Sequence, residues 1–144
     1  MFVPSAGPAR RGLPAALALV AALTLLAGCG PGNGVGIQYN GYTIQPSRAT
    51  AKAGDVVFSI ANQNGQVMHQ LLIVQTDTPA DQLRLGSDSK VDLSGLTIAG
   101  QVDQVELGQS ATLTAHLTPG HYVLLCNMVG HYQLGMHADF TVTP

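Results

Sequence analysis

The chain of 144 residues lacks tryptophan, has only two cysteines and carries few charges. The few charges restrict the kinds of partner that the protein can bind. Charged residues make up 10% of the sequence, and the few Lys and Arg residues after Cys29 are scattered among more numerous Asp and Glu. This pattern argues against a nucleic-acid partner. The sequence also has no nucleophile elbow, Walker loop or HExxH motif, and we therefore expect a protein that is not an enzyme.

The sequence has no apolar run long enough to span a bilayer. The longest, at residues 17–27, covers about 11 residues, well short of the ~20 that a membrane-spanning helix needs. Arg10 and Arg11 precede it and small residues follow it, in the order of a secretory signal. The stretch Leu-Ala-Gly-Cys that ends at Cys29 resembles the lipobox of bacterial lipoproteins, which implies cleavage before Cys29 and lipid attachment to it. The alternatives are an uncleaved anchor or an ordinary signal with a chance cysteine.

These features predict three parts of the chain. Residues 1–28 are expected to be a lipoprotein signal peptide, residues 29–36 a glycine-rich tether, and residues 37–144 one folded domain. A lipid anchor followed by a tether would hold the domain close to a membrane surface, outside the cytoplasm.

The domain is predicted to be all-β. Residues 110–117 alternate Ala or Leu with Ser, Thr or His, and residues 137–143 alternate in the same way. Short strands separated by Gly, Pro and Asn are typical of an antiparallel sandwich or barrel. Further strands are expected at 56–63, 67–76 and 121–127, and within 37–51.

One connection is expected to contain the only helix, a short one at 78–86. Thr78 can cap it, Pro79 suits its first turn, and Gly86 can end it. The polar residues 87–104 show no clear period and are interpreted as a connecting excursion.

The stretch between the last two expected strands gathers potential metal ligands. Cys126, His131 and Met136 are spaced C-x4-H-x4-M in a loop with two glycines. If Cys29 is lipidated, Cys126 is the only free thiol, which indicates a metal ligand or a reactive thiol. Thiolate and thioether are soft ligands and imidazole is borderline, a set that suits copper cycling between Cu(I) and Cu(II). One Cys and two His with a weak axial Met describe a blue-copper electron-transfer centre.

A second histidine must then come from outside the loop. His116 and His137 lie on the polar faces of their strands and are expected to face solvent. His121 lies on the face opposite to Cys126 if that strand is regular. His69 shares a face with apolar neighbours in the 67–76 strand, and is therefore the best remaining candidate.

Two stretches together resemble the cupredoxin family of blue copper proteins. They are AGDVVFSIANQNGQVMHQLLIV and PGHYVLLCNMVGHYQLGMHADFTV, and the loop is most similar to rusticyanin- and sulfocyanin-like members. The resemblance covers roughly residues 49–142. It implies a Greek-key β-sandwich that holds one copper ion through His69, Cys126 and His131, with Met136 as the axial ligand. Phe140 and Val142 would start the core face of the last strand.

The resemblance also implies an electron carrier with neighbours of defined roles. A monomer would pass single electrons between transient redox partners, which would dock on an apolar surface around His131 formed by Val129, Tyr132 and Leu134. In this family the residues after the first histidine and after the cysteine often link the two ligand-bearing segments. We therefore expect a hydrogen bond between Gln70 and Asn127, and an Asn127 amide close to the thiolate. His137 is interpreted as a solvated strand residue, with a pH-sensitive role as the alternative.

Other metal functions use similar residues. A copper storage or delivery protein would have the same ligand types, but a fixed loop with one distant histidine favours electron transfer. Copper oxidases and nitrite reductases need further His-rich sites that this chain lacks. Zinc is a weaker candidate because a thioether is an unusual zinc ligand.

Overall fold

The computed structural model describes residues 32–64 and 66–144. The expected signal peptide, Cys29 and the first part of the expected tether lie outside the described residues. The described part of the chain forms nine strands and no helix: β1 (Gly34–Asn40), β2 (Thr43–Pro46), β3 (Thr50–Lys52), β4 (Gly54–Asn64), β5 (His69–Gln75), β6 (Thr97–Val105), β7 (Ser110–Leu117), β8 (Gly120–Leu125) and β9 (His137–Thr143). Within the same residues, no helix has the length and apolar character needed to cross a membrane.

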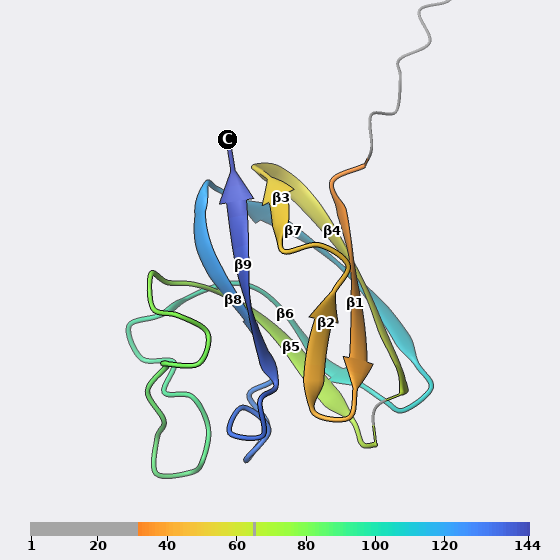
Figure 1. Ribbon diagram of the computed structural model, residues 1–144, viewed down its shortest axis with the longest axis vertical. Coiled ribbons are helices and arrows are strands. Elements are labelled where there is room, and N and C mark those ends of the chain that lie inside the picture. The colour runs from red at the N-terminus through yellow and green to blue at the C-terminus, as the bar shows by residue number, and fades with distance from the viewer. Residues whose placement is uncertain (1–31, 65) are drawn as a thin grey trace, which may run out of the picture. The chain divides into compact units, whose positions relative to one another are not determined.

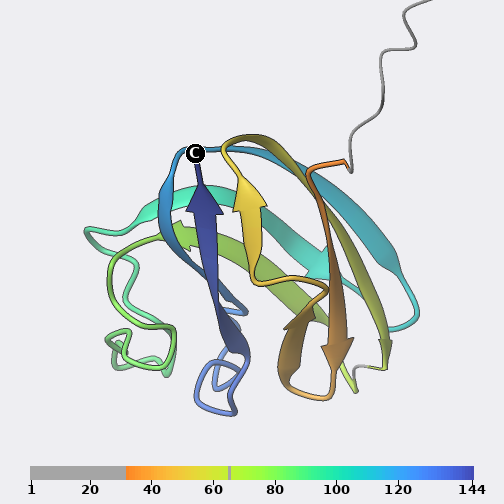
Figure 2. The same cartoon turned by 45° about the horizontal axis from the view of Figure 1, so that its top comes forward.

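The strands form two sheets that face each other (Figure 1, Figure 2). One has the order β2-β1-β4-β7 and the other the order β3-β9-β8-β5-β6. Most neighbouring strands are antiparallel, but β1 runs parallel to β4 and β3 runs parallel to β9. The chain therefore changes sheet between β2 and β3, and its first strands form an edge of each sheet.

The core lies between the two sheets. Along β4, buried residues alternate with more exposed ones, and the buried set includes Val56, Phe58 and Ile60. Phe58 meets Phe140 of β9, with ring centroids 5.7 Å apart. Phe140 and Val142 are both buried in this core, so their predicted core face is confirmed. The all-β, two-sheet prediction is likewise confirmed.

A second apolar cluster explains why β5 and β8 are almost continuously apolar. Their outward-facing residues Leu72, Val74, Val123 and Leu125 are buried by the segment that connects β5 to β6. This connection, residues 76–96, is drawn in green on the outer side of the five-stranded sheet in Figure 1. We call it the 76–96 segment.

The short helix predicted at 78–86 is wrong. The amide of Gln82 donates to the carbonyl of Pro79 (3.0 Å), which closes a single turn. The amide of Leu83, which a helix would pair with that same carbonyl, donates instead to the hydroxyl of Tyr132 (2.9 Å). Leu85 then bridges to Val91 in an isolated antiparallel contact. Tertiary hydrogen bonds have replaced the helical ones that the capping residues predicted.

Two predicted boundaries also differ from the structure. Strand β1 begins at Gly34, so residues 34–36 belong to the folded domain rather than to the tether, and Val35 is fully buried. Strand β6 occupies most of the second half of the 87–104 excursion. It lies at the edge of its sheet and is largely exposed, so its sequence carries no clean alternation of apolar and polar residues.

Candidate metal centre

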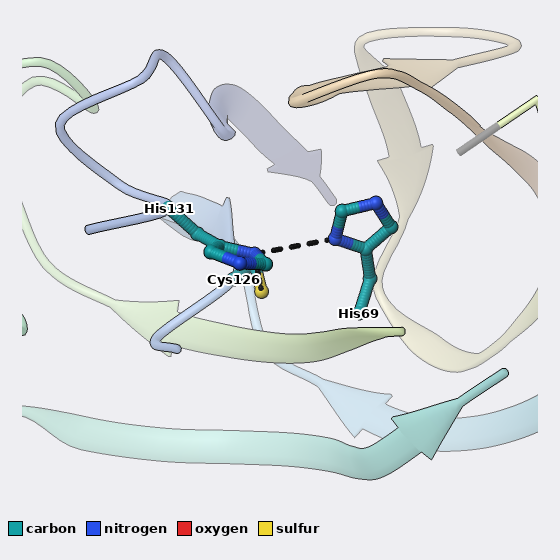
Figure 3. Close-up of side chains that lie close together, drawn as sticks. All are labelled: His69, Cys126 and His131. Atoms are coloured by element: carbon teal, nitrogen blue, oxygen red, sulfur yellow. Dashed lines mark hydrogen bonds between the residues drawn. The ribbon is translucent and has the colours of Figure 1, made fainter. Parts of the chain in front are cut away.

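Three side chains from separate parts of the chain converge at one end of the sandwich. Nδ1 of His69 lies 3.3 Å from Nδ1 of His131, and the latter lies 3.4 Å from Sγ of Cys126. Figure 3 shows the two imidazoles next to each other and steeply inclined, with an interplanar angle of 69°, and the sulfur of Cys126 beside them. All three residues are buried, and their potential ligand atoms lie within 4.8 Å of one another. The structure thus brings together three of the four predicted ligands.

Strand pairing accounts for this convergence. Strands β5 and β8 are antiparallel neighbours, so His69 at the start of β5 lies beside Cys126, which follows directly after β8. The amide of Gln70 donates to Sγ of Cys126 (3.3 Å), which holds the sulfur against the start of strand β5. The pairing of β5 with β8 alone therefore brings His69 and Cys126 together, without any contribution from the loop.

The loop 126–136, which we call the ligand loop, closes on itself. The amide of Cys126 donates to the carbonyl of Met136 (3.0 Å), and the amide of Met136 donates to the carbonyl of His131 (3.1 Å). Gly130 and Gly135 both have positive φ, the conformation that glycine adopts without steric cost. These bonds hold the backbone of the predicted axial residue between the two other loop ligands. Met136 is fully buried in the same apolar cluster as Cys126.

Burial sets the protonation of these groups. Desolvation lowers the pKa of His69, and the neighbouring His131 lowers it further. Desolvation likewise lowers the pKa of His131. Burial raises the pKa of the Cys126 thiol, while the backbone amides of Gln70 and Met128 oppose this effect. Both imidazoles are thus neutral, the form that binds metals, and the thiol must lose its proton when a metal binds.

The residues fit a single transition-metal ion. Nitrogen and thiolate ligands lie about 2.0–2.3 Å from a metal of this class, so two ligands of one ion are at most about 4.6 Å apart. The separations of 3.3 Å and 3.4 Å meet this limit. Two neutral imidazoles and a thiol, without a nearby carboxylate in the cluster, form a borderline-to-soft set that favours copper over magnesium or calcium.

Two tyrosines that the sequence did not single out cover the imidazoles. The ring of Tyr39 meets His69 edge-on at 5.1 Å, and its hydroxyl donates to the carbonyl of Gln70 (3.2 Å). Tyr42, in the turn between β1 and β2, lies 5.0 Å from His131 and 6.0 Å from His69, nearly perpendicular to both. Burial raises the pKa of Tyr39, so its hydroxyl stays protonated and can donate. These rings thus pack against the two imidazoles on one side of the site.

The expected link between Gln70 and Asn127 is wrong. The Asn127 side chain instead pairs with the backbone of Val91, accepting from its amide (2.7 Å) and donating to its carbonyl (3.2 Å). Gln70 acts on the site through its backbone, whose amide reaches the sulfur of Cys126. The amides close to this sulfur thus belong to Gln70 and Met128 rather than to Asn127.

The predicted docking residues divide into two kinds. Val129 and Leu134 are 65% and 59% exposed, whereas Tyr132 is only 5% exposed and cannot line a docking surface. Val67, two residues before His69, is a further exposed apolar side chain that the sequence did not indicate. His131 was expected to lie near the surface, but it is buried and only 8% exposed.

The remaining histidines lie outside the cluster. His116 is exposed, as predicted, and Nδ1 of its ring lies 2.7 Å from Asp55. His121 lies against Asp139, and His137 packs on Tyr132 with ring centroids 4.7 Å apart. His137 is partly buried by this contact rather than fully solvated, and the pH-sensitive role stays a prediction.

The metal-free protein is expected to lose stability as the pH falls below about 6.5, the ordinary histidine value. Because burial lowers the pKa of His69 and His131, the unfolded chain binds protons that the folded chain does not, and stability rises with pH through this range. Each such imidazole contributes up to about 1.4 kcal/mol per pH unit. Urea unfolding at several pH values measures the slope. A variant with both residues changed to Gln should have a clearly smaller slope, and an unchanged slope would contradict the prediction.

Comparison with known proteins identifies a family and a fold. The model of the sulfocyanin (SoxE) domain family matches residues 22–144. The fold is similar to dithionite-reduced auracyanin from the photosynthetic bacterium Roseiflexus castenholzii, with a TM-score of 0.58 at 23% identity over 80% of this chain and 100% of that one. It is also similar to auracyanin A, a "blue" copper protein from Chloroflexus aurantiacus, with a TM-score of 0.52 at 17% identity over 76% and 98% of the two chains.

A third similar structure is rusticyanin from Thiobacillus ferrooxidans, with a TM-score of 0.50 at 19% identity over 78% of this chain and 79% of that one. No significant match was found among curated protein sequences. The family match spans the whole described domain, and the buried His–Cys–His cluster supplies the ligands of a copper site. The chain therefore belongs to the sulfocyanin (SoxE) domain family of blue copper proteins, the cupredoxins, and its cofactor is copper.

Proposed function

We propose that the protein is a type 1 copper electron carrier that works outside the cytoplasm, held at a membrane by lipid on Cys29. The observation that carries the proposal is that the buried side chains of His69, Cys126 and His131 converge. Nδ1 of His131 lies 3.3 Å from Nδ1 of His69 and 3.4 Å from Sγ of Cys126. When bound, copper supplies a one-electron Cu(I)/Cu(II) couple. Met136 is proposed as the weak axial ligand because its burial and its backbone bonds place it beside both other loop ligands.

The chain contributes a site whose ligands are fixed before metal arrives. The sulfur of Cys126 accepts a hydrogen bond from Gln70, and the ligand loop is closed by its own backbone bonds. Tyr39 and Tyr42 pack against the imidazoles. Groups that are held in this way change position little when the metal changes charge, which lowers the barrier to electron transfer.

A transient partner is proposed to dock where the ligand loop is most apolar. Val129 and Leu134 flank His131 in the sequence of this loop, and both are well exposed. Weak redox encounters bury less than about 1,200 Å², an area that a small apolar patch with a polar rim can supply. A short electron path would then run through the imidazole of His131. The domain is proposed to act as a monomer.

Copper storage or delivery is the second candidate. One observation favours it: Met68 and Met128 line the same open pocket of about 290 Å³, next to Asn127. Thioethers that reach solvent are the ligand type of Cu(I) handling sites. The buried His–Cys–His cluster argues for retention of the ion instead. Rapid loss of Cu(I) to a chelator would favour delivery, and slow loss would favour electron transfer.

The deciding experiment is a Cu(II) titration of a soluble form that begins ahead of β1, at Gly30. The visible and EPR spectra should show an intense thiolate-to-copper band, one copper per chain, and reversible reduction and reoxidation. A colourless or weakly coloured complex would exclude the electron carrier.

A further inference from the structure

The ligand loop is attached to the rest of the protein largely through the 76–96 segment. The Tyr132 hydroxyl donates to the carbonyl of Ala80 (2.6 Å) and accepts from the amide of Leu83 (2.9 Å). The amide of Gly130 donates to the carbonyl of Ser89 (3.0 Å). Together with the pairing of Asn127 and Val91, these bonds join the two irregular segments at three separate points.

The junction includes an unusual backbone conformation. Ser89 has φ of 59°, and it is the one non-glycine residue with positive φ in the described part of the chain. Such conformations carry a cost and persist where surrounding contacts enforce them. Here the strained residue presents its carbonyl to the ligand loop at Gly130. The strain therefore lies at the contact between the segment and the loop.

The other end of the segment is anchored to the five-stranded sheet. Oδ1 of Asp139, on β9, accepts from the amide of Ala80 (2.8 Å) and lies 2.9 Å from Nε2 of His121, on β8. Nδ1 of the same histidine faces the carbonyl of Thr76. Two strands thus fix the start of the segment at Thr76 and Ala80, and contacts from Ala80 onward hold the ligand loop.

Tyr132 connects the ligand loop to the 76–96 segment. It follows His131 in sequence, its ring packs on His137, and His137 follows Met136. One side chain therefore fixes the loop next to an imidazole ligand and next to the proposed axial ligand. The tyrosine is buried, and its hydroxyl is fully engaged with backbone groups of the 76–96 segment.

We propose that the 76–96 segment positions the copper ligands, and that the hydroxyl of Tyr132 is the positioning group through which it acts. The inference rests on the proposed copper function. The hydroxyl of Tyr132 bonds to the backbone of Ala80 and Leu83 in the segment, so it acts on the ligands through the loop. It determines where the ligand loop holds His131 relative to Cys126, and thereby the geometry that sets the reduction potential.

The test replaces Tyr132 with phenylalanine, which keeps the ring and removes only the hydroxyl. In the copper protein, Tyr132→Phe should shift the reduction potential and the copper hyperfine splitting in EPR. In the metal-free protein, the amides of Gly130, His131 and Leu134 should exchange with solvent about tenfold faster, because two buried backbone groups lose their partner.

The matched control is Tyr122→Phe. Tyr122 is equally buried, and its hydroxyl also donates to a carbonyl and accepts from an amide, both of Thr118 (2.9 Å and 3.2 Å). This variant should lower Tm by a similar amount, with potential, EPR and ligand-loop exchange unchanged. If Tyr132→Phe lowers Tm but also leaves those three properties unchanged, its role is merely structural and the proposal is overturned.

A second variant, Asn127→Ala, removes the pairing with Val91 and should change loop exchange in the same direction. The proposed copper function and the positioning role of Tyr132 can be tested separately. If the unaltered protein forms no coloured copper complex, the proposed function fails, yet faster loop exchange in metal-free Tyr132→Phe would still support the positioning role. Unchanged exchange in both variants would overturn the positioning role even if the copper complex is intensely coloured.

Discussion

Replacing Cys126 with serine is expected to abolish the intense visible absorption of the copper protein and leave the two-sheet fold in place. The colour requires charge transfer from a thiolate to copper, and a serine oxygen is a hard ligand that does not supply it. Cys126 is fully buried, and the amide of Gln70 can donate to a hydroxyl as it does to the sulfur. Absorption and EPR spectra of the copper-loaded variant measure the loss, and circular dichroism checks the fold.

The control for this prediction is His116→Gln. His116 offers a copper-ligand type, but it is exposed and pairs with Asp55 outside the buried cluster. This variant should keep the full colour. A Cys126→Ser protein that stayed intensely blue would show that the thiolate of this residue is not the source of the band, and the assignment of the site would be wrong.

Met136→Leu is expected to keep the visible band and raise the reduction potential. Leucine has a similar volume, so the substitution at this buried position should cost less than about 1.5 kcal/mol of stability. Loss of the weak thioether donor disfavours the more highly charged Cu(II) state relative to Cu(I). A tenfold change in that preference corresponds to about 59 mV for one electron, and we expect a rise of at least this order. Cyclic voltammetry measures it directly.

Met128→Leu provides the comparison. Met128 lies in the same loop, between Cys126 and His131, but lines the open pocket and is only partly buried. Its replacement should leave the potential nearly unchanged. If Met128→Leu raised the potential and Met136→Leu did not, the axial ligand would have been assigned to the wrong methionine.

The sequence predicted the strands best where one face is buried and the other is exposed. Residues 110–117 show this clearly, and β7 has the same bounds. Prediction from the sequence failed where contacts with distant residues determine the local structure. Capping residues at 78–86 favour a helix, but Asp139 and Tyr132 take up the amides of Ala80 and Leu83 and favour an irregular path. No local pattern reports such partners.

The same distinction applies to the site. His69, Cys126 and His131 were predictable because ligand chemistry restricts the residue types, and the structure brings these three together. The packing of Tyr39 and Tyr42 on the imidazoles could not be predicted, because it depends on how β1 pairs with the rest of its sheet. The partner of Asn127 was missed for a related reason, since Val91 belongs to a segment without periodicity.

The two parallel pairings have a consequence for how the protein is made. Strand β1 pairs with β4, which is near in the sequence, but β3 pairs with β9, the last strand that the structure describes, and His69 lies beside an imidazole 62 residues further on. In a chain that is still being synthesised, the loop ligands therefore lack the imidazole of His69 beside them until β5 has paired with β8. Contacts between such distant residues form late and slowly. We therefore expect the complete copper site to form only once the domain has folded.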